Sequence, residues 1–272
     1  MNRFTKIFSL VFHRSPNPDE DVEIDGGQNE NFVLIRGGEF TMGSPVDESA
    51  WSDDETLHKV KVSDFSMGRY AVTVSEFRSF VDATGYRTDA EKEGDSRNWH
   101  HDVNGQLRLQ SEDNHPVMRV SWNDAVAYCE WMSKRSGKTY RLPTEAEREY
   151  ACRAGTTSPF NIGNNLTTEQ ANYYVYPKGV YRKNTVPVNS FSPNAWGLYN
   201  MHGNVWEWCS DWYGDYPSGT VSNPVGPATG SNRVLRGGGW GCYAESCRSA
   251  YRSSDAPGDR GSYVGFRLVF VP

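Results

Sequence analysis

Aliphatic side chains are scarce in this chain of 272 residues, and so are long apolar runs. Hydrophobic residues make up 37% of the sequence, yet aromatic residues reach 13% and include nine tryptophans. We therefore expect rings to fill much of the core. A membrane-spanning helix needs roughly 20 consecutive apolar residues. No stretch of the sequence comes near that length, so we expect no membrane span.

Positive charge is also in short supply. The 28 Lys and Arg residues are outnumbered by 34 Asp and Glu residues, which gives a formal net charge of −6 at pH 7. Nucleic-acid binding normally requires a clustered positive surface. The sequence holds no basic run that would build one, so we expect no nucleic-acid partner.

Cysteine is limited to five residues. The odd number argues against a full disulfide framework, and neither a Cys-x-x-Cys pair nor a cysteine–histidine cluster at zinc-binding spacing occurs. Near the start, the apolar run from Ile7 to Phe12 is short, and Ser9 interrupts it. A secretory signal needs about 7–15 apolar residues. These features predict a cytoplasmic chain, with display on a cell surface left open.

The chain divides into two parts by composition. Residues 1–31 are acidic and polar with prolines and glycines, which predicts a disordered tail. Residues 32–272 form the expected domain. Capping residues, apolar spacing and a final glycine predict two main helices in it, at 73–85 and 121–137. The polar residues 86–114 predict a long surface loop.

Six short motifs follow one another along this domain. They are IRGGEFTMGS at 35–44, MGRYAVTVSEFRSF at 67–80, HPVMRVSWNDAVAYCEW at 115–131, RLPTEAEREYACRAG at 141–155, NAWGLYNMHGNVWEWCSDWY at 194–213, and RVLRGGGW with CRSAYR and VGFRLV at 233–269. Together they resemble the formylglycine-generating enzyme family, also called the sulfatase-modifying factor family. Arg148 is a local departure, because the family usually has tryptophan at that place.

The resemblance implies an α+β fold of the C-type-lectin-like, formylglycine-generating-enzyme kind. Such a fold has a small antiparallel sheet, two main helices and much irregular structure. The family includes oxidases, other enzymes and pure binding proteins. Function must therefore be argued from the site rather than from the fold.

The C-terminal segment contains two cysteines that decide between an enzyme and a binding protein. In oxidases of the family, two cysteines bind copper(I) and oxidise a sulfatase cysteine to an aldehyde, and soft thiolates suit copper(I). Counted from the glycines at 237–239, Cys242 and Cys247 have the family's spacing. Counted from the Arg-x-Ala-x-Arg element at 248–252, they do not, because that element follows Cys247 directly. The alternative is a buried Cys247 thiol near Cys209, in contact with it or disulfide-bonded to it.

A second pattern in this segment indicates binding. When the motif residues are removed from 239–263, every remaining residue can be written by a codon derived from AAC by replacing its adenines, which resembles the variable region of proteins diversified by retroelements. These residues are Gly239, Gly241, Cys242, Tyr243, Ser246, Ser249, Tyr251, Ser253, Ser254, Asp255, Ala256, Gly258, Gly261, Ser262 and Tyr263. Tyrosine, serine and glycine are typical of binding surfaces, because a rigid ring needs little ordering and small neighbours adapt. Tyr243, Tyr251 and Tyr263 would be the anchors. Asp255 would add a polar contact.

The leading hypothesis is therefore a protein that binds an unknown protein or other macromolecule through the surface at about 239–263, diversified or not by a retroelement. The alternative hypothesis is an enzyme. On that interpretation Cys242 and Cys247 would carry out copper-dependent, formylglycine-generating oxidation, and copper would be a cofactor only in this case.

The motif NMHGNVWEW resembles a calcium loop of the family. By that resemblance the ligands of a calcium ion would be the side-chain oxygens of Asn200 and Glu207 and the backbone carbonyls of Gly203 and Val205. Oxygen ligands of this kind suit calcium. The alternative is that Glu207 forms an ion pair with an arginine of the C-terminal segment.

Other polar residues are interpreted as structural. Arg236, Arg248, Arg252 and Arg267 are expected to hold a loop-rich core together through buried ion pairs. His202 is interpreted as a surface or packing residue rather than as a catalytic base.

Overall fold

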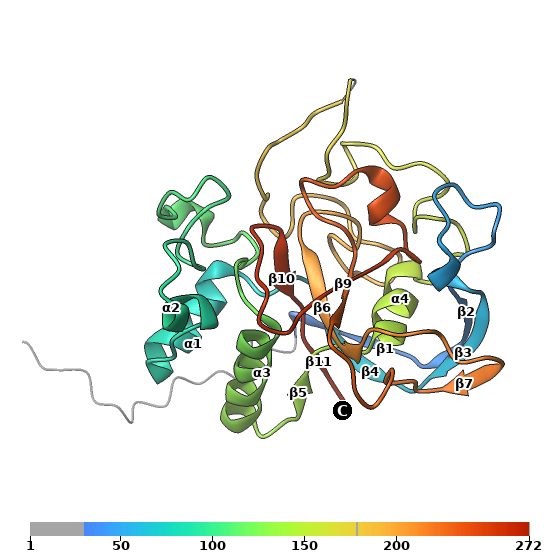
Figure 1. The fold of residues 1–272 in the computed structure, drawn as a ribbon, viewed down its shortest axis with the longest axis horizontal. Coiled ribbons are helices and arrows are strands. Elements are labelled where there is room, and N and C mark those ends of the chain that lie inside the picture. The colour runs from blue at the N-terminus through green and yellow to red at the C-terminus, as the bar shows by residue number, and fades with distance from the viewer. Residues whose placement is uncertain (1–29, 178, 272) are drawn as a thin grey trace, which may run out of the picture. The chain divides into compact units, whose positions relative to one another are not determined.

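Helices and strands are short, and much of the chain between them is irregular (Figure 1). The structure is a computed structural model that describes residues 30–177 and 179–271. The tail predicted at 1–31 lies outside these residues, apart from its last two. The predicted α+β class is confirmed. Within the described residues, no helix is both long enough and apolar enough to cross a membrane.

The secondary structure of the described residues has the following bounds. The α-helices are α1 (Val74–Thr84), α2 (Asp89–Glu93), α3 (Trp122–Ser136) and α4 (Glu145–Arg153). The strands are β1 (Phe32–Ile35), β2 (Gly38–Met42), β3 (His58–Val62), β4 (Phe65–Gly68), β5 (Tyr140–Arg141), β6 (Trp206–Trp212), β7 (Thr220–Ser222), β8 (Arg233–Arg236), β9 (Arg252–Asp255), β10 (Val264–Phe266) and β11 (Val269–Phe270). The 3-10 helices are η1 (Asp53–Glu55), η2 (Gln110–Glu112) and η3 (Ala244–Cys247).

The strands form three small sheets, which refines the prediction of one. Their orders are β1-β4-β11-β5, β10-β6-β8-β9 and β2-β3-β7. Most neighbours are antiparallel, but β10 pairs with β6 and β7 pairs with β3 in parallel. In the second sheet, Arg236 of β8 lies opposite both Glu207 of β6 and Arg252 of β9. That sheet therefore gathers charged residues from three strands at one place.

Both main helices lie where their capping residues predict them. Thr73 and Glu76 form a capping box at α1, and Ser121 and Asp124 form one at α3. Each helix ends at a glycine in the left-handed conformation. The surface loop predicted at 86–114 is wrong in part, because the short helix α2 lies within it.

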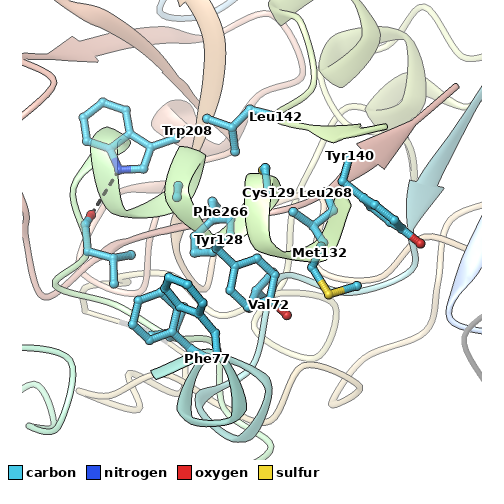
Figure 2. Packing of buried hydrophobic residues seen from close by; sticks show 14 of the residues in the cluster. Val72, Phe77, Tyr128, Cys129, Met132, Tyr140, Leu142, Trp208, Phe266 and Leu268 are labelled. Carbon is cyan, nitrogen blue, oxygen red and sulfur yellow. Dashed lines mark hydrogen bonds between the residues drawn. The ribbon is translucent and has the colours of Figure 1, made fainter. Parts of the chain in front are cut away.

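Rings fill the core beneath α1 and α3, as the composition predicts (Figure 2). Phe77 of α1 stacks on Tyr128 of α3 with 6.0 Å between ring centroids, and both rings meet Phe266 of β10 edge-on. Trp208 of β6 is fully buried, and its Nε1 donates to the Val120 carbonyl at 3.1 Å. Aromatic pairs of this kind add about 0.5–1.5 kcal/mol beyond the burial of their area.

The four arginines of the C-terminal segment form buried ion pairs, which confirms the interpretation made from the sequence. The pairs are Arg236–Glu149, Arg248–Glu55, Arg252–Glu145 and Arg267–Glu207. Each pair links the C-terminal segment to an element far away in the sequence. Removing one partner of a buried pair costs about 3–5 kcal/mol, so these pairs fix loops that have little regular structure of their own.

Candidate binding surface and the C-terminal cysteines

The C-terminal segment starts with a tight glycine turn after β8. Gly237 and Gly238 have φ values of 98° and 74°, which favour glycine. A Cβ atom on Gly238 would lie 2.5 Å from the sulfur of Cys247. The glycines at 237–238 therefore allow this turn to pack closely against η3.

Most residues predicted for the binding surface are at least partly accessible. Tyr243 and Tyr263 are 59% and 42% exposed, and Gly241 is exposed as well. The half-buried residues are Cys242, Ser246, Tyr251, Ser253, Ser254, Asp255, Ala256, Gly258, Gly261 and Ser262. Gly239 and Ser249 are buried. These two residues face the interior, so they are not positioned to touch a ligand.

Tyr243 belongs to a cluster of rings that sequence reasoning missed. Its ring meets Tyr174 edge-on with 4.9 Å between centroids, and Tyr174 meets Tyr181 in the same way at 4.8 Å. Tyr181 in turn stacks on Trp240 at 6.3 Å. The Tyr174 N–H donates to the Cys242 carbonyl at 2.7 Å, which fixes the two segments together.

Tyr263 follows Ser262, and Ser262 is hydrogen-bonded to the same cluster. Trp240 Nε1 donates to the Ser262 carbonyl at 2.9 Å, which holds the two segments side by side. We define the aromatic surface as Tyr174, Tyr181, Trp240, Tyr243 and Tyr263. The sequence did carry a signal for its first part, because four tyrosines occur within YYVYPKGVY. Nothing in the spacing showed which distant segment they would meet.

The two candidate copper ligands lie in different environments. Cys242 is half-buried, and its sulfur accepts the indole N–H of Trp206 at 3.2 Å. Cys247 is buried in an apolar cluster, and its sulfur faces the Tyr243 carbonyl at 3.6 Å. Burial raises the pKa of the Cys247 thiol well above its usual value. Copper(I) is held by thiolates, and a bound metal ion lowers the pKa of its own thiol ligands. The charge of Cys242 also raises the pKa of Cys247, so the two thiols act on each other electrostatically, and copper binding stays a prediction.

All five cysteines are free thiols. The disulfide considered between Cys209 and Cys247 is therefore not formed. Cys247 packs instead with Phe160 and Tyr173, in a small cluster separate from the main core. Cys129, which belongs to α3, lies in the main core.

Glu207, a predicted calcium ligand, has both carboxylate oxygens bound to arginines. Its Oε2 accepts from Arg148 Nε at 2.7 Å, and its Oε1 accepts from Arg267 Nη2 at 2.8 Å. Burial opposes the charge of this carboxyl, but the guanidinium groups of Arg148 and Arg267 outweigh burial and lower its pKa. Arg148 replaces the tryptophan usual in the family, so this departure has a structural role. The structure thus shows the ion pair that was the alternative to calcium.

The remaining predicted calcium ligands offer little more. Asn200 Nδ2 donates to the Val188 carbonyl at 2.7 Å, while its Oδ1 is buried and accepts no hydrogen bond among the described residues. That oxygen alone suits a cation. Calcium takes six to eight oxygen ligands, and with Glu207 committed, these residues together with Gly203 and Val205 do not fit one as they lie. Calcium binding stays a prediction.

His202, Cys152 and Ser249 form a buried polar cluster next to the C-terminal segment. His202 Nδ1 donates to the Cys247 carbonyl at 2.7 Å, and its Nε2 accepts the Asn161 N–H at 3.0 Å. Cys152 Sγ is 3.8 Å from both ring nitrogens and 3.6 Å from Ser249 Oγ. Both ring nitrogens therefore already have hydrogen-bond partners. These contacts support the packing interpretation of His202 and explain why Ser249 is buried.

Comparison with known proteins shows the family. A family model described as "Sulfatase-modifying factor enzyme 1-like domain" matches residues 19–271. The chain is 37% identical to the formylglycine-generating enzyme of Mus musculus, over 87% of this chain and 74% of that protein. It is 36% identical to the formylglycine-generating enzyme of Streptomyces coelicolor, over 87% of this chain and 88% of that one.

Solved structures agree with this. PvdO from Pseudomonas aeruginosa superposes with a TM-score of 0.75 at 34% identity, covering 89% of this chain and 94% of that one. Treponema denticola variable protein 1 superposes with a TM-score of 0.72 at 28% identity, covering 89% and 95%. Fold and motifs thus define a protein of the formylglycine-generating-enzyme class. The chain belongs to the sulfatase-modifying factor family.

Proposed function

We propose that this chain is a ligand-binding member of the family and that it binds through the aromatic surface and the small residues around it. The observation that carries the proposal is the contrast between Tyr243 and Cys247. Tyr243 is largely exposed and is held in place by neighbouring rings. Cys247, which an oxidase would need as a copper ligand, is fully buried and packs against Phe160 and Tyr173.

The arrangement of Tyr243 suits binding for a thermodynamic reason. Ordering a flexible side chain at an interface costs about 0.5–1.5 kcal/mol. Tyr243 is already braced by Tyr174, which is itself braced by Tyr181, so little of this cost remains. The half-buried Ser253 and Asp255 of β9 lie in the same C-terminal segment and can supply adaptable hydrogen bonds.

Diversification by a retroelement is the finer form of the proposal. It is supported by the codon pattern at 239–263 and by the likeness to Treponema denticola variable protein 1. Sequencing the gene from several isolates tests it. We expect substitutions at exposed positions such as Tyr243 and Tyr263 and constancy at buried Gly239 and Ser249. Variation spread evenly along the domain would contradict diversification but would leave binding untouched.

Photo-crosslinking in the source cells tests binding itself. A p-benzoylphenylalanine residue would replace Tyr243, and a matched control would place it at Leu109, which is 68% exposed and lies outside the surface. We expect a discrete adduct from position 243 that excess unlabelled protein competes away. Identical adducts from both positions, or none from 243, would overturn the proposal.

The oxidase is the second candidate, and two observations favour it. Cys242 and Cys247 keep the spacing counted from the glycines, and identity to formylglycine-generating enzymes reaches 37%. Incubation with copper(I), oxygen and a sulfatase-derived cysteine peptide, followed by aldehyde capture with a hydrazide, tests it. We expect no aldehyde. An aldehyde that disappears in Cys242→Ser would establish the oxidase instead.

A further inference from the structure

A cavity of about 480 Å³ opens beside the end of β6 and shares no residue with the aromatic surface. It lies between β3, the start of α4 and the segment at 213–227, which follows β6 and contains the short strand β7. This segment is held close to β6, because a Cβ on Gly226 would lie 2.9 Å from both Asp211 Cβ and the Trp212 carbonyl oxygen. The segment at 213–227 is therefore packed against β6, and together they form one wall of the cavity.

The walls of the cavity are mostly apolar and aromatic. They include Met42, Trp212, Tyr216, Pro224 and Pro227. A wall of this kind fits the body of a small organic molecule. Its polar groups must then decide which molecules can enter.

Four buried polar side chains line the cavity, and two of them are committed to each other. Arg252 Nε and Nη2 donate to Glu145 at 2.7 and 2.9 Å. The other Arg252 donations go to the carbonyls of Asp54 and Gly214, and Glu145 also accepts from the Tyr216 hydroxyl at 3.2 Å. The opposite charges of Arg252 and Glu145 offset each other, so this pair does not make the cavity attractive to an anion.

The other two buried side chains, Asp211 and His58, keep open acceptors. Asp211 Oδ2 accepts from the Glu145 N–H and from the Ser210 hydroxyl, both at 3.0 Å, whereas Oδ1 has no hydrogen bond to a described residue. His58 Nδ1 lies 3.0 Å from the Thr56 carbonyl and must donate to it. In neutral His58 the remaining nitrogen, Nε2, is an acceptor.

Negative charge continues at the mouth of the cavity. Asp215 lines both this cavity and a second hollow, and the second hollow also contains Asp53 and Asp54. Asp211 forms no ion pair with another described residue, whereas the neighbouring Glu145 does. A basic group of a ligand in the cavity would therefore be the first cationic partner of Asp211.

We propose that this cavity binds an organic amine, with its ammonium group at Asp211 and its apolar body between Trp212, Tyr216 and the prolines. Asp211 Oδ1 and His58 Nε2 can accept hydrogen bonds, so they favour a ligand that donates them. The unpaired carboxyl of Asp211 favours a ligand that carries a positive charge. An ammonium group provides both. Burial and the neighbouring charge of Glu145 raise the pKa of Asp211 to about 7, as expected for a carboxyl that lacks its cation.

Binding of benzylamine, measured by isothermal titration calorimetry on the full chain, tests the proposal. Benzyl alcohol is the neutral control of the same shape. We expect saturable binding of benzylamine below about 10 mM and at least about tenfold weaker binding of benzyl alcohol. Equal binding of the two compounds, or no binding of benzylamine, would overturn the proposal.

Two variants locate the site. Asp211→Asn should weaken benzylamine binding at least about tenfold, because a charge-assisted hydrogen bond is lost, while the matched control Asp82→Asn on the exposed face of α1 should not. Val225→Trp places a bulky ring in the cavity lining and should block binding without touching Asp211. Unchanged affinity in Val225→Trp would place the amine elsewhere and sink the proposal even if Asp211→Asn failed to fold.

The pH dependence provides a further check. The charged groups acting on Asp211 are Glu145 and Glu147 from α4, Arg141 from β5 and Arg233 from β8. His58 of β3, Arg252 of β9 and Asp215 of the segment at 213–227 complete the lining. Binding should tighten between pH 6 and 8 as Asp211 ionises, and this tightening should be absent in Asp211→Asn. A flat profile in the unmodified chain would contradict a role for the Asp211 charge.

Discussion

Glu207 and Asp211 lie on the same strand, β6, and are both almost fully buried, yet their partners differ. Glu207 holds two guanidinium groups, which lower its pKa. Asp211 accepts only a backbone N–H and a hydroxyl, and its pKa is raised to about 7. Burial alone therefore does not make an acid structural. An acid whose oxygens are all bound holds the fold together, and an acid with a free oxygen is open to a ligand.

The largest expected effect on stability comes from removing the carboxylate of Glu207. Glu207→Ala leaves Arg148 and Arg267 buried without their shared carboxylate, and this should lower the free energy of unfolding by about 3–5 kcal/mol. Chemical denaturation measures it. The control Glu39→Ala removes an exposed acid from β2 and should stay within about 0.5 kcal/mol. A similar, small loss in both variants would show that the buried network contributes nothing.

The open acid should respond to pH with the opposite sign. Because the folded-state pKa of Asp211 is raised from 3.8 to about 7, the folded state keeps a proton that the unfolded chain has released. The unfolding free energy of wild type relative to Asp211→Asn should therefore fall as pH rises from about 4 to 7, by roughly 1.4 kcal/mol per unit at most. Glu207, with its lowered pKa, instead loses its stabilisation as the pH falls through that lowered value. Parallel curves for wild type and Asp211→Asn would refute the raised pKa.

The cysteines also differ from one another, in their accessibility to solvent. Cys242 is half-buried, whereas the other four cysteines are buried. A thiol reagent should label one cysteine rapidly in the native protein and all five after denaturation. Cys242→Ser should remove the rapid phase. Rapid labelling that persists in Cys242→Ser would show that Cys247 or another buried thiol is accessible.

Calcium sharpens the comparison at Glu207 itself. If Arg148 and Arg267 keep the carboxylate of Glu207, the chain should have the same Tm in calcium and in chelator. A rise in Tm with calcium that Asn200→Ala abolishes would support the calcium site predicted from the motif.

The smallest effect on stability is expected at the binding surface. Tyr243→Ala removes a ring that is mostly exposed but pairs with Tyr174, so the unfolding free energy should fall by about 0.5–1.5 kcal/mol. Tyr128→Ala, in the core, should cost about 3–5 kcal/mol by analogy with other large aromatic truncations. A core-like loss at Tyr243 would mean that its ring serves packing rather than binding.

Local signals predicted much of the fold. Thr73 and Ser121 cap the two main helices because a cap needs only neighbours three residues away. The buried ion pairs of the C-terminal arginines were also predictable in kind, because an arginine in a loop-rich core must find a carboxylate. Their partners were not, since Glu55 and Glu145 lie far from them in sequence.

The site was less predictable for the same reason. Nothing local distinguishes buried Ser249 from half-buried Ser253, or shows that Tyr174 meets Tyr243. The difference between Glu207 and Asp211 depends on where Arg148 and Arg267 come to lie. Sequence reasoning selected the C-terminal segment as the candidate, and tertiary contacts decide which of its residues are exposed.

Titration with copper(I), in competition with a chelator of known affinity, tests the central claim most directly. The unmodified chain, Cys242→Ser and Cys247→Ser should behave alike, with no stoichiometric site, because the Cys247 thiol is fully buried in an apolar cluster. One copper(I) per chain, lost when either cysteine is replaced, would contradict the binding function proposed here and establish the oxidase.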